Sequence, residues 1–123
     1  RAILLEKFRI NPELVIGLDE DRTHIISLDN NTSVNALVGS SSTPPSQNKG
    51  VTMQLTLIDA NHCPGACMFL IEGYFGTVLH TGDFRFDPLI LQHFALQNKK
   101  IDVLHLDDTY AHPDYVFPTR VRF

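Results

Sequence analysis

The sequence predicts an α/β chain that is mostly strands, with short helices. Apolar stretches of strand length, each bounded by turn residues, fall at residues 55–57, 68–70 and 77–81. Two other stretches, one near each end of the chain, carry apolar residues at helical spacing instead. The 123 residues are enough for a core, but for at most one small domain.

The N-terminal element is predicted to be a helix over residues 3–8. It should end near Asn11, because the residue before a proline is pushed out of the α region. The acidic residues 19–21 then read as a solvated turn rather than as a metal-binding loop. Residues 23–28 follow as a strand, in which we expect His24 to be a surface or partly buried residue and not a ligand.

Residues 29–50 are the one stretch of low complexity. Asn, Ser and Thr dominate it, together with the pair Pro44 and Pro45. Such a composition buries too little apolar surface to offset the loss of chain entropy on ordering. We therefore predict a flexible loop or insertion there.

Two further elements complete the predicted fold. Residues 89–96 carry apolar residues at roughly helical spacing, with His93 at the surface. Residues 101–106 read as a second buried strand. His80 and His105 lie inside strands, and we expect both to be structural.

His62 and Asp83 are the candidate ligands. His62 follows the strand at residues 55–57, inside a turn containing Pro64 and Gly65, and Asp83 comes directly after Gly82. An imidazole and a carboxylate at the ends of two strands can converge on one metal ion. Both residue types also cap turns without binding anything. The residues alone leave both readings open.

The motifs around these two residues resemble a known family. Residues 60–66 read ANHCPGA and residues 81–85 read TGDFR. This pair resembles the metallo-β-lactamase-fold nucleases of the β-CASP group, and more narrowly their DNA cross-link repair branch. The resemblance implies a partial metallo-β-lactamase αββα sandwich. Residues 1–106 would form the central part of that domain, and residues 107–123 would begin the β-CASP insert.

The resemblance also implies roles for individual residues. The loop histidine, His62, would bind one metal ion, and Asp83 would bridge two and take part in catalysis. Asp107 matches the acidic residue of a Leu-Asp-x-Thr motif that supports the active site; the alternative is a plain turn-capping carboxylate. The cofactor would be one or two Zn²⁺ ions. No His-x-His-x-Asp-His motif occurs here, so the ligand set is incomplete and the chain alone is expected to be inactive.

Two neighbouring features have competing interpretations. A zinc knuckle of His62, Cys63 and Cys67 is disfavoured, because structural zinc takes four protein ligands and no second Cys/His pair lies at finger spacing. Cys67 is expected to pack as a small apolar residue. Arg85 is expected to pair with the motif carboxylates, since arginine suits bidentate carboxylate pairing, or else to contact phosphate.

The function implied is 5′ to 3′ exonuclease action on DNA ends, in interstrand cross-link repair and telomere-end protection in the nucleus. Telomere-binding proteins would be contacted through regions outside this chain. The alternatives are an RNA-processing or lactamase-like hydrolase on the same fold, or a truncated, non-catalytic product. Arg1 stands where a complete chain would begin with Met, so we expect a fragment.

Composition sets the outer limits on partners. The formal net charge of −4 provides no overall basic field for nucleic acid. No apolar run approaches the roughly 18 residues that a membrane span needs, so no membrane partner is expected.

Overall fold

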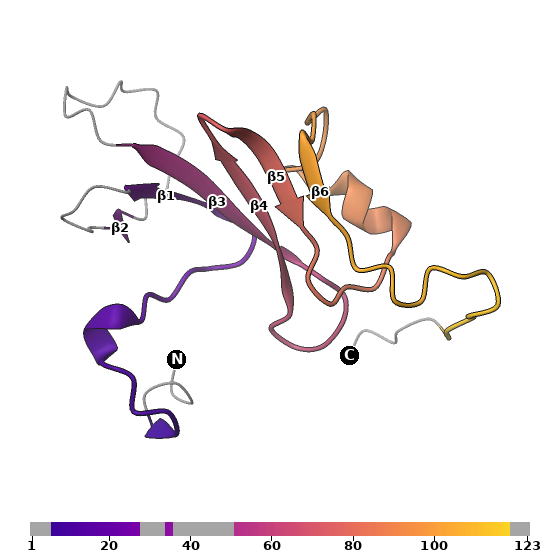
Figure 1. The fold of residues 1–123 in the computed structure, drawn as a ribbon, viewed down its shortest axis with the longest axis horizontal. Coiled ribbons are helices and arrows are strands. Elements are labelled where there is room, and N and C mark those ends of the chain that lie inside the picture. Colours follow the sequence, from indigo (N-terminus) through magenta and orange to yellow (C-terminus); the bar gives the residue numbers. More distant parts are fainter. Residues whose placement is uncertain (1–5, 28–33, 36–50, 119–123) are drawn as a thin grey trace.

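Six strands form one mixed sheet in the part of the chain that the computed structural model describes, residues 6–27, 34–35 and 51–118 (Figure 1). Their order across the sheet is β2-β1-β3-β4-β5-β6. The strands are β1 (Thr23–Ser27), β2 (Val34–Asn35), β3 (Thr52–Asp59), β4 (Cys67–Gly73), β5 (Gly76–His80) and β6 (Val103–His105). Two 3-10 helices accompany them, η1 (Pro12–Leu14) and η2 (Pro88–Gln92). This β-rich arrangement with few helices is compatible with a partial sandwich.

The strands β3, β5 and β6 run in the same direction. β3, β4 and β5 form an antiparallel meander, and β6 pairs with β5 in parallel. A parallel neighbour requires a crossover, which residues 81–102 supply. The last residues of β3, β5 and β6 therefore lie together, at the lower right of the sheet in Figure 1. We call this the carboxyl end of the sheet.

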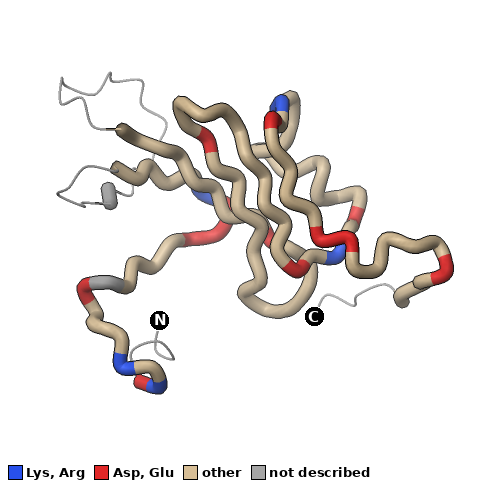
Figure 2. The backbone as a smooth tube through the Cα atoms, in the orientation of Figure 1, with Lys and Arg blue, Asp and Glu red and all other residues tan. Residues whose placement is uncertain are grey.

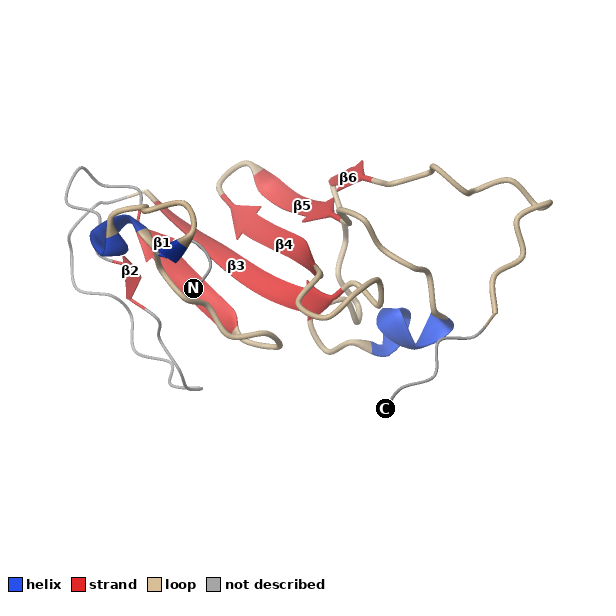
Figure 3. Ribbon diagram, turned by 90° about the horizontal axis from the view of Figure 1, so that it is seen from below, coloured by secondary structure: helices blue, strands red, loops and turns tan. Residues whose placement is uncertain are grey.

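The buried core lies between the sheet and the crossover. Ile58 of β3 is 2 % exposed and pairs with Met68 of β4, so both side chains point to the same face. Ala95 in the crossover packs against them. Partly buried residues extend this contact: Leu79, Phe84, Ile90, Leu96 and Ile101. Figure 3 shows η2 lying to one side of the strands, where the crossover covers that face.

In the part of the chain that the structure describes, the opposite face of β4, β5 and β6 is largely exposed. The register sets Phe69, His80 and His105 side by side in one row. Phe69 is 42 % exposed, and Val103 in the next row is 45 % exposed. The rings of His80 and His105 stack with their centroids 5.5 Å apart. Within the described residues one face of this half of the sheet is thus packed, and the other exposes apolar side chains beside two histidines.

The predicted N-terminal helix falls mostly on residues 1–5, which lie outside the described residues. Of the remainder, Glu6 is helical and residues 7–11 are not. η1 begins at Pro12, where the missing proline N–H breaks no helical bond, and the Glu13 N–H donates to Asn11 Oδ1 at 3.1 Å. Within the described residues the α-helical conformation thus ends at Glu6, earlier than the predicted end near Asn11. Figure 1 shows this segment running away from the sheet.

Three later predictions are corrected by the structure. Residues 89–96 form no α-helix, because η2 is closed by three-residue bonds such as the His93 N–H to the Ile90 carbonyl at 3.0 Å. β6 is shorter than predicted and exposed, since it is the edge strand of the described sheet. His24 is buried, and its Nε2 lies 2.9 Å from the Asp19 carbonyl oxygen.

The predicted loop at residues 29–50 contains the short strand β2, which pairs with β1. The rest of that stretch lies outside the described residues. The proposed division into residues 1–106 and 107–123 stays a prediction. None of the helices in the described ranges is long and apolar enough to cross a membrane.

Candidate functional site

The loop that carries His62, residues 60–66, is closed at its base and folded at its tip. At the base, the Ala60 N–H donates to the Ala66 carbonyl at 3.0 Å. At the tip, the Ala66 N–H donates to the Cys63 carbonyl at 3.0 Å. Gly65 has a φ of +83°, which the third position of a type II turn requires, and a proline such as Pro64 suits the second. The loop leaves the His62 side chain exposed.

Two hydrogen bonds fasten this loop to the segment that carries Asp83. The Arg85 N–H donates to the Ala60 carbonyl at 2.9 Å, and Asn61 Nδ2 donates to the Arg85 carbonyl at 3.4 Å. Asp83 lies two residues before Arg85 and is exposed. His62 and Asp83 therefore stand on adjoining segments at the carboxyl end of the sheet.

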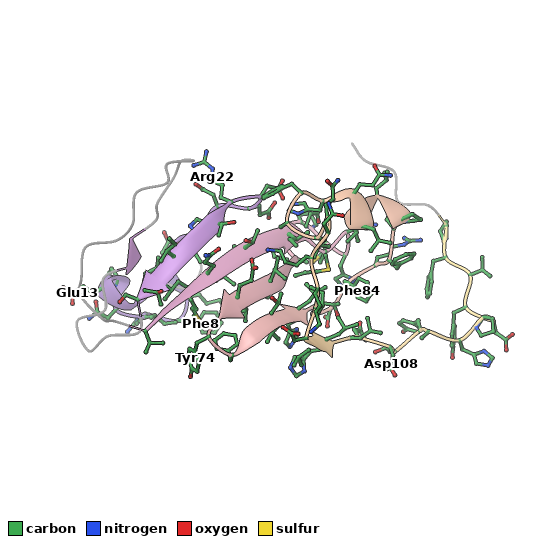
Figure 4. The ribbon with its side chains drawn as sticks, turned by 90° about the horizontal axis from the view of Figure 1, so that it is seen from above. Phe8, Glu13, Arg22, Tyr74, Phe84 and Asp108 are labelled. Carbon is green, nitrogen blue, oxygen red and sulfur yellow. The ribbon has the colours of Figure 1, made fainter. Side chains whose placement is uncertain are left out.

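Asp107 follows β6 at the same end. Its N–H donates to Thr81 Oγ1 at 3.0 Å, and the Thr81 N–H donates to the His105 carbonyl at 3.0 Å. The Asp107 carboxylate accepts both the N–H and the hydroxyl of Thr109, at 3.1 and 2.5 Å. Asp107 thus caps a turn, as its alternative interpretation expected. Figure 4 labels the next residue, Asp108, on the segment that leaves the sheet.

The electrostatics link the histidine loop to Asp107. Hydrogen bonds from Thr109 hold the pKa of the Asp107 carboxyl below its usual range, and the charge of His62 lowers it further. The imidazole therefore lies within electrostatic reach of an ionised carboxylate. Figure 2 shows acidic positions gathered at this end of the sheet. Imidazole nitrogen and carboxylate oxygen are both accepted by zinc.

The described residues do not by themselves complete a metal site. Across residues 6–27, 34–35 and 51–118, no three His, Cys, Asp or Glu side chains are placed to hold one ion. The structure brings the two predicted ligands, His62 and Asp83, to one end of the sheet, and the described residues place no third ligand with them. Their ligand roles, and the role of Asp107, stay predictions.

Arg85 has partners that the sequence did not indicate. Its guanidinium donates to the Pro118 carbonyl and lies 5.8 Å from the centre of the Phe117 ring. Phe117 in turn meets Tyr110 edge to face, with centroids 5.3 Å apart. Among the described residues no carboxylate pairs with Arg85, so the expected pairing with motif carboxylates is not seen. Arg85 instead fastens the segment after β6.

The acidic turn before β1, residues 19–21, contacts the start of β4 and the crossover. Cys67 Sγ donates to Glu20 Oε1 at 3.4 Å, and His93 Nε2 lies 2.9 Å from Asp21 Oδ1. Burial raises the pKa of the Cys67 thiol to about 11, with Glu20 adding to the effect. Cys67 therefore stays a thiol, but it is half-buried and donates to a carboxylate instead of packing only as a small apolar residue. His93, predicted at the surface, is half-buried by its contact.

Two buried polar side chains at the carboxyl end of the sheet had no predicted role. Asn61 is 7 % exposed and Thr81 is 3 % exposed, and each bonds one site segment to another. The sequence could have indicated a structural role for Asn61, because it lies beside a Pro-Gly turn and asparagine tolerates a left-handed backbone. Nothing in the sequence distinguished Thr81, since threonine is common in any strand.

Known proteins resemble this chain over most of its length. It is 54 % identical to 5′ exonuclease Apollo of Mus musculus over 120 residues, which are 97 % of this chain and 19 % of that protein. Over 69 residues, 55 % of this chain, it is 49 % identical to the DNA cross-link repair 1A protein of Homo sapiens, covering 6 % of that protein. The chain matches a segment of DNA cross-link repair proteins. The resemblance to the DNA cross-link repair branch, predicted from residues 60–66 and 81–85, is thereby confirmed.

The similarity also reaches plants. Over 69 residues the chain is 46 % identical to the DNA cross-link repair protein SNM1 of Arabidopsis thaliana, covering 14 % of that protein. No family model matches the chain. The chain spans 19 % of the length of mouse Apollo, so it corresponds to one segment of such a protein.

Proposed function

We propose that this chain is a segment of a metal-dependent DNA nuclease that acts in cross-link repair. The observation that carries the proposal is the meeting of three segments, which bear His62, Asp83 and Asp107, at one end of the sheet. Active sites are built from such convergent loops at strand ends. Similarity to cross-link repair proteins supports DNA as the substrate class.

The proposed roles follow from the donor types. His62 would offer an imidazole nitrogen to one Zn²⁺ ion, and Asp83 would offer two carboxylate oxygens, which suit a pair of ions. Catalytic zinc usually keeps three protein ligands, so the remaining ligands are proposed to come from outside the described residues. Bound zinc lowers the pKa of a water molecule and stabilises the leaving oxygen of a phosphodiester. Asp107 supports this arrangement from the third segment.

The finer proposal is a 5′ to 3′ exonuclease. One relative is named a 5′ exonuclease, which supports attack from 5′ ends. We place the protein in the nucleus, in interstrand cross-link repair and telomere-end protection, with telomere-binding partners contacting regions outside this chain. The net charge of −4 means that the basic surface for DNA is proposed to lie outside this segment.

The test uses the longest natural protein that carries this sequence. Matched DNA and RNA oligonucleotides, labelled at the 3′ end and phosphorylated at the 5′ end, are incubated with the protein in zinc and again after chelation. We expect zinc-dependent, stepwise loss of nucleotides from the DNA. Preference for RNA would instead support the RNA-processing alternative.

The matched variants are Asp83→Asn and Asp108→Asn. Asp83→Asn keeps the side-chain size but replaces one ligand oxygen by an amide, so cleavage should be abolished with the fold intact. Asp108→Asn makes the same change on an exposed residue and should cleave normally. Full activity of Asp83→Asn would refute the assigned ligand.

A further inference from the structure

Asn61, the residue directly before His62, has an unusual backbone. Its φ is +53°, in the left-handed region where non-glycine residues are uncommon and asparagine is among those best tolerated. Its N–H donates to Asp59 Oδ1 at 2.8 Å, which folds the chain back at the end of β3. The side chain is buried, so its amide points into the structure and not into solvent.

The amide of Asn61 reaches across to another segment. Nδ2 donates to the carbonyl of Arg85 at 3.4 Å, 24 positions along the chain. Asn61 adjoins one proposed ligand, His62, and Arg85 lies two residues after the other, Asp83. A short path of covalent bonds therefore leads from this hydrogen bond to each ligand.

The loop does not need this bond to keep its shape. Its base is closed between Ala60 and Ala66, and its tip by the turn from Cys63. Those bonds lie inside the loop. The Asn61 amide acts between segments, beside the backbone bond from the Arg85 N–H to the Ala60 carbonyl at 2.9 Å. That backbone bond should keep the two segments together when the amide is lost, so the loop should shift relative to Asp83 without opening.

We propose that Asn61 is a positioning residue, whose buried amide sets where His62 stands relative to Asp83. The inference rests on the proposed function. Asn61 touches neither metal nor substrate in this scheme. It acts through His62, by fixing the backbone from which the imidazole extends. Residues that orient metal ligands in this way typically contribute 10- to 100-fold, as an order of magnitude, to metal affinity or activity.

The decisive variant is Asn61→Gly in the longest natural protein that carries this sequence. Glycine adopts the positive φ without strain and removes only the amide. The Zn²⁺ dissociation constant is measured by competition with a chromophoric chelator, alongside kcat and KM on a DNA oligonucleotide. We expect the Zn²⁺ dissociation constant to rise about 10-fold or more and kcat to fall at limiting zinc, with KM little changed.

Asn98→Gly is the matched control. Asn98 also has a positive φ, of 56°, but it is exposed in the crossover away from the loop. The same chemical change there should leave the Zn²⁺ dissociation constant unaltered. A parallel thermal melt shows whether each variant is folded.

A second pair of variants decides the question if Asn61→Gly does not fold. Asp59→Ala removes the carboxylate that accepts the Asn61 N–H, whereas Asp59→Asn keeps an acceptor oxygen and removes the same charge. Asp59 is exposed, so both changes should be tolerated. The inference expects weaker zinc binding for Asp59→Ala than for Asp59→Asn.

The outcomes separate the inference from the proposed function. If the natural protein has no zinc-dependent nuclease activity and binds no zinc, the proposed function fails and the inference falls with it. If that protein is active but Asn61→Gly, or the Asp59 pair where it is used, binds zinc like the parent, the inference alone is overturned. Weaker zinc binding by Asn61→Gly with Asn98→Gly unchanged supports it.

Discussion

Asp102 Oδ2 accepts the Thr77 N–H at 3.0 Å. The same oxygen lies against the start of β5, because a Cβ added to Gly76 would be only 2.6 Å from it. Gly76 also has a φ of +99°. Glycine there permits both the β4–β5 turn and the approach of the carboxylate that joins the crossover to β5.

Replacing Gly76 by alanine should therefore be costly. The backbone strain and the clash with Asp102 together should lower the free energy of unfolding by about 1–3 kcal/mol. Gly17→Ala is the matched control, because a Cβ there meets nothing within 4 Å, and it should change stability by less than about 0.5 kcal/mol. Urea unfolding monitored by circular dichroism measures both. Equal stabilities of the two variants would contradict the geometry.

Asp102 should also make stability depend on pH. The Thr77 N–H, and then Lys100, hold the pKa of the Asp102 carboxyl below its ordinary value of 3.8. Because the folded pKa is depressed, the carboxylate stabilises the fold above pH 3.8, and this contribution is lost as pH falls through the folded value. The melting temperature of the wild type should exceed that of Asp102→Asn at pH 6, and the gap should shrink below pH 3.8. A constant gap down to pH 2 would exclude this linkage.

The two cysteines should differ in reactivity. The thiolate is the reactive form, and Cys67 has a pKa of about 11 while Cys63 is exposed. At pH 8 Cys67 should react with iodoacetamide on the order of a hundredfold more slowly than an ordinary thiol of pKa about 8.5. Mass spectrometry of timed digests gives both rates. Glu20→Gln removes the carboxylate that accepts the hydrogen bond of the Cys67 thiol and raises its pKa, so it should speed the labelling of Cys67. An unchanged labelling rate would argue against that contact.

Arg85 should order the segment after β6. Lysine in its place keeps the charge but loses the planar group that lies over Phe117 while bonding the Pro118 carbonyl. Arg85→Lys should raise hydrogen exchange over residues 110–118 by a few-fold, since an exposed cation–π contact contributes about 0.5–1 kcal/mol. Lys7→Ala, which removes another cation from a ring at Phe8, should leave that segment unchanged.

Asp107 should matter for turnover more than its neighbour. It accepts two hydrogen bonds from Thr109 and lies within the electrostatic reach of His62, whereas Asp108 is exposed on the departing segment. Asp107→Asn in the natural protein should lower kcat by about 10- to 100-fold if it supports the metal site. Asp108→Asn should be near wild type. Equal kinetics for the two variants would leave Asp107 as a turn cap.

The sequence predicted the strands near the site well because their signals are local. Alternating or continuous apolar residues with turn residues at both ends located β3, β4 and β5, and the Pro64–Gly65 pair located the turn between β3 and β4. His62 and Asp83 were singled out because each follows a strand beside a glycine turn. These features need no knowledge of distant contacts.

What the sequence could not predict depends on contacts between distant segments. At the edge of the described sheet the β6 residues 103–105 are exposed, although the apolar run at 101–106 predicted a buried strand. The partner of Arg85 is a carbonyl 33 positions away, and the partner of His93 is a carboxylate 72 positions away. The side chains of Arg85 and His93 could be recognised as hydrogen-bonding groups from the sequence, but their partners depend on the fold.

The exposed row that contains Phe69, with Val103 in the next row, affects the solubility of these 123 residues in isolation. An exposed apolar strip on one face of a sheet promotes adsorption to surfaces and self-association. A segment or partner that covers this face would therefore raise the solubility of the sheet as well as support it.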